Sequence, residues 1–212
     1  RGTLSDTIRL NLHLRTAHRV LYLLREFSCH TGEHLYQKVR GIPWHEYIPA
    51  DGYLTIGSSV DHPSVRDPRY PNRKCKDAIV DRLRSETGRR PDTGPDRHRA
   101  AVFLYWHENR CAVYLDTSGE ALQKRGYRKI PGPAPMQETL AAACVLASSW
   151  RGDGHVINPM SGGATLAIEA ALIGLNRAPG LVRLNYAFMH LLGFSPEDLK
   201  QERAQARQAA RK

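Results

Sequence analysis

The sequence predicts an α/β fold, and three observations support that class. Hydrophobic residues make up 41% of the 212 residues, which is enough for a packed core and excludes wholesale disorder. Short runs of β-branched and aromatic residues alternate with stretches of helical periodicity in both halves of the chain. Turn-forming Gly and Pro residues separate these runs, and we find no internal repeat.

The first quarter of the chain predicts two helices and two strands. Ser5 precedes an apolar-periodic run over 8–17 and is a candidate N-cap. Residues 19–27 (RVLYLLREF) predict a mostly buried strand, with a continued helix as the alternative. A second helix is expected to begin after Thr31 and to end before Pro43. The run 53–56 then predicts a strand that ends at a glycine.

A basic segment follows, which we expect to be an extended loop and then a helix. Residues 61–72 contain three prolines, and Asn72 is the candidate N-cap of a helix that runs to about residue 86. At ~100° per residue, one face of this helix is apolar and the opposite face is cationic. The apolar face holds Cys75, Ile79 and Leu83, and the cationic side holds Arg73, Lys74 and Arg84. This pattern is typical of an ordinary amphipathic helix, and the alternative is an edge that binds phosphate.

The second half predicts a hairpin, a linker and a βα unit. Strands at 100–106 and 111–116 flank a short polar turn. The run Gly132-Pro133-Ala134-Pro135 is the best candidate linker because its residues are stiff and extended. After it we expect a helix over 136–149, a strand over 155–157, a glycine turn, and an apolar helix over 165–175.

The cysteines and histidines do not indicate a metal site. The chain has four cysteines and no C-x-x-C pair, so we expect reduced, buried thiols: Cys29, Cys75, Cys111 and Cys144. His30 and His34 have H-x-x-x-H spacing, but Gly32 lies between them and no third ligand follows at a suitable distance. We therefore expect no metal cofactor.

The charge of the chain is more informative. The formal net charge is +10 and the sequence pI is about 9.7, which favours a polyanionic partner. Basic residues gather in three segments, at 66–76, 124–129 and 203–212. No window reaches the ~18 consecutive apolar residues that a membrane helix needs, and no signal peptide is visible. We therefore expect a soluble, cytoplasmic protein with no membrane partner.

One turn carries the chemical signal of the sequence. Residues 158–165 (NPMSGGAT) lie between the predicted strand and helix, where small residues let backbone N–H groups approach a ligand at the N-terminus of a helix. The turn is not G-x-G-x-x-G and lacks the Lys-Ser/Thr of a P-loop. By spacing alone, a ligand loop and a tight structural connection are equally favoured.

The run NPMSGGATLAIEAALIGLNRAPGL resembles motif I of class I methyltransferases that modify RNA nitrogens. The runs LDTSGEALQKRGYR and APMQETLAAA resemble the junction between a THUMP domain and its methyltransferase domain. Three earlier runs match the same family in order: NLHLRTAHRVLYLLREF, LYQKVRGIPWHEYI and KCKDAIVDRL. The chain is therefore identified as similar to THUMP-containing RNA methyltransferases, most closely the large-subunit (23S) rRNA guanine-N2 enzymes.

The resemblance implies a domain order and two sites. The domains would be a partial ferredoxin-like region (1–30), a THUMP domain (31–130), a linker (131–135) and the first part of a Rossmann-like methyltransferase domain (136–212). The site for S-adenosylmethionine would consist of Glu138, Thr139, Asn158, Pro159, Met160, Ser161, Gly162, Gly163, Ala164 and Thr165. Structured RNA, rRNA rather than tRNA, would contact Arg66, Arg69, Arg73, Lys74, Lys76, Lys124, Arg125 and Arg128.

The chain departs from the family pattern in two places. In the loop, Ser161, Gly163 and Ala164 replace the usual Cys, Ser and second Gly, and a left-handed Ala164 would cost on the order of 1 kcal/mol. The later acidic motif and the Asn-Pro-Pro-Tyr-type catalytic motif do not occur before Lys212. We therefore expect part of a larger enzyme, inactive by itself and without catalytic residues of its own.

The alternatives are a non-catalytic THUMP-type RNA-binding module and a protein that binds another small molecule. We expect Glu169 to interact with a helix N-terminus rather than to catalyse.

Overall fold

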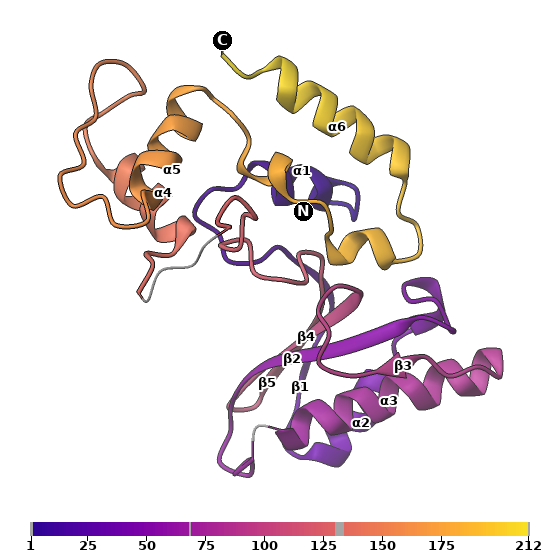
Figure 1. Cartoon of the computed structure of the whole chain (residues 1–212). Helices are drawn as coiled ribbons and strands as arrows, with labels where there is room; N and C mark the ends of the chain where they lie inside the picture. The colour runs from indigo at the N-terminus through magenta and orange to yellow at the C-terminus, as the bar shows by residue number, and fades with distance from the viewer. Residues whose placement is uncertain (1, 68, 130–133, 212) are drawn as a thin grey trace. The chain divides into compact units, whose positions relative to one another are not determined.

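The computed structural model describes residues 2–67, 69–129 and 134–211 (Figure 1). These residues form two compact units. We call residues 21–120 with 185–194 the sheet unit, and residues 1–20, 121–184 and 195–212 the helical unit. The linker predicted at 131–135 falls largely outside the described residues.

The sheet unit is built on one mixed five-stranded sheet. Its strand order is β1-β5-β4-β2-β3, with bounds Leu21–Ser28 (β1), Tyr53–Asp61 (β2), Asp92–Thr93 (β3), Ala100–His107 (β4) and Arg110–Asp116 (β5). β5 pairs antiparallel with both β1 and β4, whereas β2 pairs parallel with β3 and β4. The helices of this unit are α2 (Gly32–Arg40), α3 (Arg69–Thr87), η1 (Trp44–Glu46) and η3 (Ala187–His190). The mixed α/β class predicted from the sequence is confirmed.

The local predictions for this unit hold, apart from two boundaries and the burial of β1. The strand predicted at 19–27 is formed, but none of the residues of β1 is buried, since it lies at the edge of the sheet. Thr31 caps α2 by accepting a hydrogen bond from the backbone N–H of His34 at 3.1 Å. β2 does not end at Gly57 but continues to Asp61, because β4 pairs with it over its whole second half. Asn72 is not an N-cap, since α3 begins three residues earlier and contains Pro71 in its first turn. Proline is tolerated there because a first-turn N–H has no partner within the helix.

The core lies between the two helices and one face of the sheet. Along β4, the alternate residues Val102, Leu104 and Trp106 are buried. The predicted apolar stripe of α3 is likewise buried, with Cys75, Ile79 and Leu83 all at 0% exposure. In Figure 1, α2 and α3 lie beside each other next to the strands. The residues of β4 between these buried ones point to the opposite face of the sheet, and one of them, Tyr105, is exposed.

The cysteines differ from the prediction at one position. Cys29, Cys75 and Cys111 are buried free thiols, and burial raises the pKa of the Cys75 thiol to about 12. Cys144 is exposed, although we predicted it to be buried. It lies on an apolar helix on which Ala141, Ala142 and Val145 are the buried face, and so the thiol falls on the other side.

The helical unit contains α1 (Asp6–His13), α4 (Glu138–Ala147), α5 (Thr165–Gly174), η2 (Pro179–Val182) and α6 (Pro196–Gln208). α1 packs against α6 and η2, and α4 packs against α5. α1 stops at His13 rather than near residue 17, and Ser5 precedes it without a side-chain capping bond. None of the helices in the described ranges is both long and apolar enough to cross a membrane.

The strand predicted at 155–157 is not formed. These three residues are irregular and exposed, with Ile157 at 85% exposure. A strand requires a partner for its backbone N–H and C=O groups, and all strands in the described residues belong to the sheet unit. The two helices predicted around this segment are confirmed with slightly shorter bounds, as α4 and α5.

Candidate functional site

The turn at 158–164 leads directly into the N-terminus of α5. Gly162 and Ala164 both have left-handed backbones, with φ of 48° and 57°. Ala164 occupies the N-cap position of α5 and provides no side-chain cap. Its N–H donates to the carbonyl of Ser161 at 2.7 Å, which closes the turn. Position 164 therefore carries a left-handed alanine, and its backbone strain costs about 1 kcal/mol of stability.

The bend is open. A Cβ atom placed on Gly162 or on Gly163 would meet no atom within 4 Å. The side chains from Pro159 to Gly163 are exposed, and that of Met160 is 89% exposed. No described side chain therefore fills the turn, and the first backbone N–H groups of α5 have no side-chain acceptor from the cap.

Two of the other predicted cofactor residues begin α4 and are buried. Glu138 is 6% exposed and Thr139 is 2% exposed. The hydroxyl Oγ1 of Thr139 is buried and has no hydrogen-bond partner among the described residues. A buried hydroxyl without a partner is costly, so a ligand that bonds to it would be favoured.

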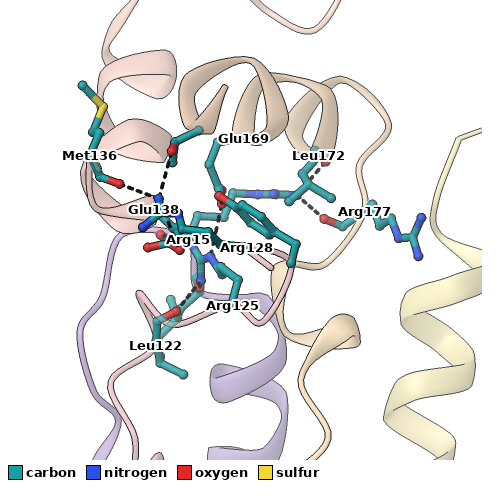
Figure 2. Close-up of polar contacts among 12 residues, drawn as sticks. Arg15, Leu122, Arg125, Arg128, Met136, Glu138, Glu169, Leu172 and Arg177 are labelled. Atoms are coloured by element: carbon teal, nitrogen blue, oxygen red, sulfur yellow. Dashed lines mark hydrogen bonds and ion pairs between the residues drawn. The ribbon is translucent and has the colours of Figure 1, made fainter. Parts of the chain in front are cut away.

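Arg128 connects the starts of the two helices (Figure 2). Its Nη2 donates to the carbonyl of Met136 at 2.8 Å and to Thr165 Oγ1 at 2.9 Å, and lies 3.6 Å from Glu138 Oε1. Met136 precedes α4, and Thr165 is the first residue of α5. One guanidinium therefore fixes two of the predicted cofactor residues, Glu138 and Thr165, relative to each other.

Two more arginines hold α5 farther along its length. Arg125 is 3% exposed and its Nε lies 3.4 Å from Glu169 Oε1, while Arg15 Nη2 donates to the carbonyls of Leu172 and Arg177 near the helix C-terminus. Figure 2 shows these contacts arranged along the helix. A cation at a helix C-terminus is favourable, whereas Arg128 at the N-terminus opposes the helix dipole. The carboxylate of Glu138, 3.6 Å from the Arg128 guanidinium, compensates for this unfavourable interaction with the dipole.

Glu169 has a different role from the predicted one. It lies in the second turn of α5, is 0% exposed, and also accepts a hydrogen bond from Tyr127 Oη at 3.0 Å. Burial and the neighbouring carboxylate raise the pKa of Tyr127, so it stays a neutral donor. Sequence reasoning missed Arg15 and Tyr127 as partners. The one signal was a single acid within an otherwise apolar helix, which requires a buried cation.

The basic residues of the sheet unit form a groove beside α3. The groove has a volume of about 500 Å³ and is lined by Arg69, Asn72, Arg73 and Lys76 of α3 together with Leu54, Ile56, Thr93 and Gly94. Arg69, Arg73 and Lys76 have i, i+4, i+7 spacing and so share one stripe of the helix. Arg69 Nε donates to Asp67 at 3.0 Å, and Lys76 Nζ lies 3.1 Å from Asp77. The first pair is exposed and the second partly exposed, so a phosphate could replace either carboxylate.

The other predicted RNA residues lie elsewhere. Lys74 pairs with Glu33 at 3.4 Å and lies over the Tyr36 ring, on the side of α3 toward α2. Arg66 and Lys124 are exposed and do not line the groove. Arg125 is buried, and Arg128 is 20% exposed with its Nη2 bonded to Met136 and Thr165, so both guanidinium groups are engaged within the helical unit. We leave these two out of the proposed RNA surface.

The histidine pair makes a ring contact. The imidazoles of His30 and His34 stack with centroids 6.2 Å apart, and His30 Nδ1 lies 2.9 Å from Asn109 Oδ1. Among the described residues, no group of three or more His, Cys, Asp or Glu side chains is placed to hold a metal ion.

Two family models match the chain in succession. The model of the THUMP domain matches residues 29–116, and the model described as RMKL-like, methyltransferase domain matches residues 125–212. The first range begins just after β1 and contains α2, α3 and the strands β2 to β5. The second contains Arg128, α4, the open turn and α5.

Curated relatives agree with this order. The chain is 36% identical to a ribosomal RNA large subunit methyltransferase K/L of Syntrophotalea carbinolica over 98% of its length, which is 30% of that protein. The corresponding protein of Pseudomonas aeruginosa is 35% identical over 99% of the chain and 30% of its own length. The chain thus spans less than a third of these relatives.

Solved structures extend the likeness to the fold. A predicted N6-adenine-specific DNA methylase from Listeria monocytogenes superposes with a TM-score of 0.88 at 33% identity, over 99% of this chain and 55% of that one. A putative methyltransferase solved in complex with SAH gives 0.85 at 29% identity with the same coverage. Residues 29–116 are therefore a THUMP domain and residues 125–212 belong to the RMKL-like methyltransferase family, so the chain is a homologue of the ribosomal RNA large subunit methyltransferase K/L proteins.

Proposed function

We propose that this chain is the RNA-binding domain and the first part of the catalytic domain of an S-adenosylmethionine-dependent rRNA methyltransferase. The observation that carries the proposal is an open, left-handed turn at the start of α5, in a segment that matches a methyltransferase family. The adjoining helix α4 begins with a buried Thr139 hydroxyl that has no hydrogen-bond partner among the described residues. A relative of the same fold was solved with SAH, the product form of that methyl donor.

The residues around the turn suit the methionine end of the cofactor. That end is a zwitterion, and Arg128 and Glu138, whose side chains lie 3.6 Å apart where α4 and α5 begin, would exchange part of their mutual attraction for its two charges. The backbone N–H groups at 162–165 would approach the ligand most closely, because Gly162 and Gly163 present no side chain. S-adenosylmethionine supplies the methyl group on its sulfonium, and the protein's task is to align it with the attacking amine.

The finer assignment is the exocyclic N2 of a guanine in 23S rRNA. It is supported by the curated relatives, which are ribosomal RNA large subunit methyltransferases, and by a THUMP domain that precedes the methyltransferase segment. A base within a helix must leave the stack to reach such a pocket. An RNA-binding domain in the same chain would hold the surrounding RNA fold during that step.

Methyl transfer from labelled cofactor tests this function. The full-length protein is incubated with methyl-labelled S-adenosylmethionine and unmodified large-subunit rRNA, and the product nucleosides are separated by mass spectrometry. We expect N2-methylguanosine at one position. A tRNA substrate tested in parallel distinguishes the two RNA classes. If neither RNA yields a labelled nucleoside, the proposal is wrong.

One observation favours a second candidate, a non-catalytic RNA-binding module. Ala164 has a left-handed backbone at the position where glycine is expected, so the turn that would hold the cofactor is strained. Calorimetry with S-adenosylhomocysteine distinguishes the two candidates. Binding by the full-length protein supports the enzyme, whereas RNA binding without any cofactor binding supports the module.

The groove beside α3 is the proposed phosphate contact. Replacing Arg73 and Lys76 together with alanine removes two cations from the groove, so the RNA dissociation constant should rise and its salt dependence should become shallower by about two phosphate contacts. The control variant is Arg84→Ala, an exposed cation of the same helix outside the groove. Equal salt slopes for both variants would argue against the groove.

A further inference from the structure

The face of the sheet opposite α2 and α3 carries a row of aromatic side chains. Phe103, Tyr105 and His107 alternate along β4 with the buried core residues and therefore share this face. Phe103 pairs across the strands with Tyr114 of β5, which adds a fourth ring to the same face. The rings of Tyr105 and His107 stack with centroids 4.3 Å apart and an interplanar angle of 15°. We call these four residues the aromatic row.

The row is accessible. Tyr105 is 37% exposed, and Phe103, His107 and Tyr114 are partly exposed. On the covered side of the same strand, Leu104 and Trp106 are both at 0% exposure. Large rings are therefore presented to solvent on one face while the strand's apolar residues fill the core on the other. Burial of the core does not explain why these positions are aromatic.

Cationic side chains lie at both ends of the row. At one end, the guanidinium of Arg97 lies over Gly57, 3.5 Å from where a Cβ atom would be, beside the Phe103 ring. At the other end, Arg110 pairs across the strands with His107. Arg110 is 75% exposed and bonds the carboxylate of Glu26. An ion pair this exposed is weak, so a phosphate can replace the carboxylate.

Two polar groups of β2 lie at the His107 end of the row. Asp61 Oδ2 lies 3.9 Å from His107 Nδ1 and its side chain is 86% exposed, so its charge is largely screened by solvent. Ser59 of β2 contacts His107 Nε2 at 3.2 Å and offers a hydroxyl at the border. The stacked pair of Tyr105 and His107 leaves the outer ring faces for a base to continue the stack, and the cations at both ends of the row could meet its phosphates.

We propose that the aromatic row binds unpaired RNA bases, as a second RNA contact on the face of the sheet opposite the α3 groove. The proposal rests on the RNA methyltransferase function given above and adds a substrate feature to it. A duplex keeps its bases stacked internally and offers only phosphate and sugar to the α3 groove. An unpaired loop beside that duplex would place its bases on the row. The two surfaces together would select RNA in which a paired and an unpaired segment adjoin.

Variants of Tyr105 test this binding directly. Fluorescence anisotropy of the full-length protein is measured with two labelled probes, an unpaired 12-residue oligoadenylate and a blunt 12-base-pair RNA duplex. Tyr105→Ala should weaken binding of the unpaired probe about 5-fold or more, since one base loses its stacking partner. It should leave the duplex probe within 2-fold. Tyr105→Phe keeps the ring and should bind both probes like the wild type.

A matched control uses the same face of the sheet. Leu23 of β1 pairs across the strands with Tyr114 and is 49% exposed, so Leu23→Ala removes exposed apolar area without removing a ring. It should not change either affinity. If Tyr105→Ala retains wild-type affinity for the unpaired probe, or if Leu23→Ala loses as much, the stacking proposal is wrong. If the wild type binds neither probe, the RNA function itself fails, which is a separate result. Phe103→Ala, at the other end of the row, removes a ring that does not belong to the stacked pair and should also weaken binding of the unpaired probe.

Discussion

The sheet unit and the helical unit are stabilised in different ways. In the sheet unit, two amphipathic helices cover one face of a five-stranded sheet, and the largest side chains there are fully buried. In the helical unit, α4 and α5 leave Leu140, Leu146 and Leu175 between 42% and 53% exposed. What fixes α5 instead is a set of buried polar contacts with Arg15, Arg125 and Arg128.

This difference separates what holds the fold from what shapes the site. Apolar packing in the sheet unit is non-directional and tolerates small shifts of its members. Charge-assisted hydrogen bonds are directional and fix a helix in one position and rotation. The proposed cofactor turn enters α5 at the end held by Arg128, so its geometry depends on the second kind of contact.

The largest expected effect comes from the buried carboxylate. Glu169→Ala leaves Arg125 buried without a counter-ion, and the loss of one partner from a buried pair costs about 3–5 kcal/mol. Unfolding of the helical unit in urea, followed by its own tryptophan Trp150, measures the change. Glu197→Ala is the control, because its pair with Lys200 is 77% exposed and contributes at most about 1 kcal/mol. Equal losses in the two variants would contradict the contrast drawn here.

The sheet unit should respond to apolar truncation instead. Leu104→Ala opens a cavity under the helices and should lower the free energy of unfolding by about 2–5 kcal/mol. The same change at Leu146 of α4, which is 48% exposed, should cost less than about 0.5 kcal/mol. Thermal unfolding of both variants provides the measurement. A large loss at Leu146 would show that α4 depends on apolar contacts after all.

Local patterns predicted much of the fold because each depends on a few neighbouring residues. The Thr31 cap, the apolar stripe of α3 and the hairpin of β4 and β5 are all set within one element or one turn. The strand at 155–157 failed, because its formation requires a pairing partner that three residues do not specify. The predicted start of α3 was wrong because proline favours a loop but is also tolerated in the first turn of a helix.

The candidate site likewise has one part that the local sequence predicts and one part that it does not. The open turn and the left-handed Ala164 follow from the local sequence, since small residues precede a helix there. The positions of Arg125 and Arg128 do not, because charge alone predicts exposure and RNA contact. Only the fold shows that Glu169, some 40 residues later in the chain, meets Arg125, and that Glu138 and Thr165 converge on Arg128.

Removing Arg128 should affect the cofactor more than stability. Arg128→Ala releases the starts of α4 and α5 and removes the cation beside Glu138, so the dissociation constant for S-adenosylhomocysteine should rise about 10-fold. Isothermal calorimetry of the full-length protein measures it. Lys129→Ala, an exposed neighbour, should bind like the wild type. The affinity for RNA duplex should be unchanged in both, because Arg128 is not proposed to touch RNA.

The smallest effect concerns the strained residue of the turn. Ala164→Gly keeps the left-handed backbone, at φ of 57°, without the steric conflict of a Cβ atom, and should stabilise the helical unit by about 1 kcal/mol. Ala167→Gly, within α5, should instead lose about 0.5–1 kcal/mol, because glycine is a poor helix former. Opposite signs in urea unfolding of these two variants would establish that the strain belongs to position 164 and not to alanine in general. If Ala164→Gly also tightens cofactor binding, the strain opposes the bound form of the turn, whereas unchanged affinity shows that free and bound forms share it. In the second case the alanine is a constant cost of the fold, and the turn remains competent to hold the methyl donor.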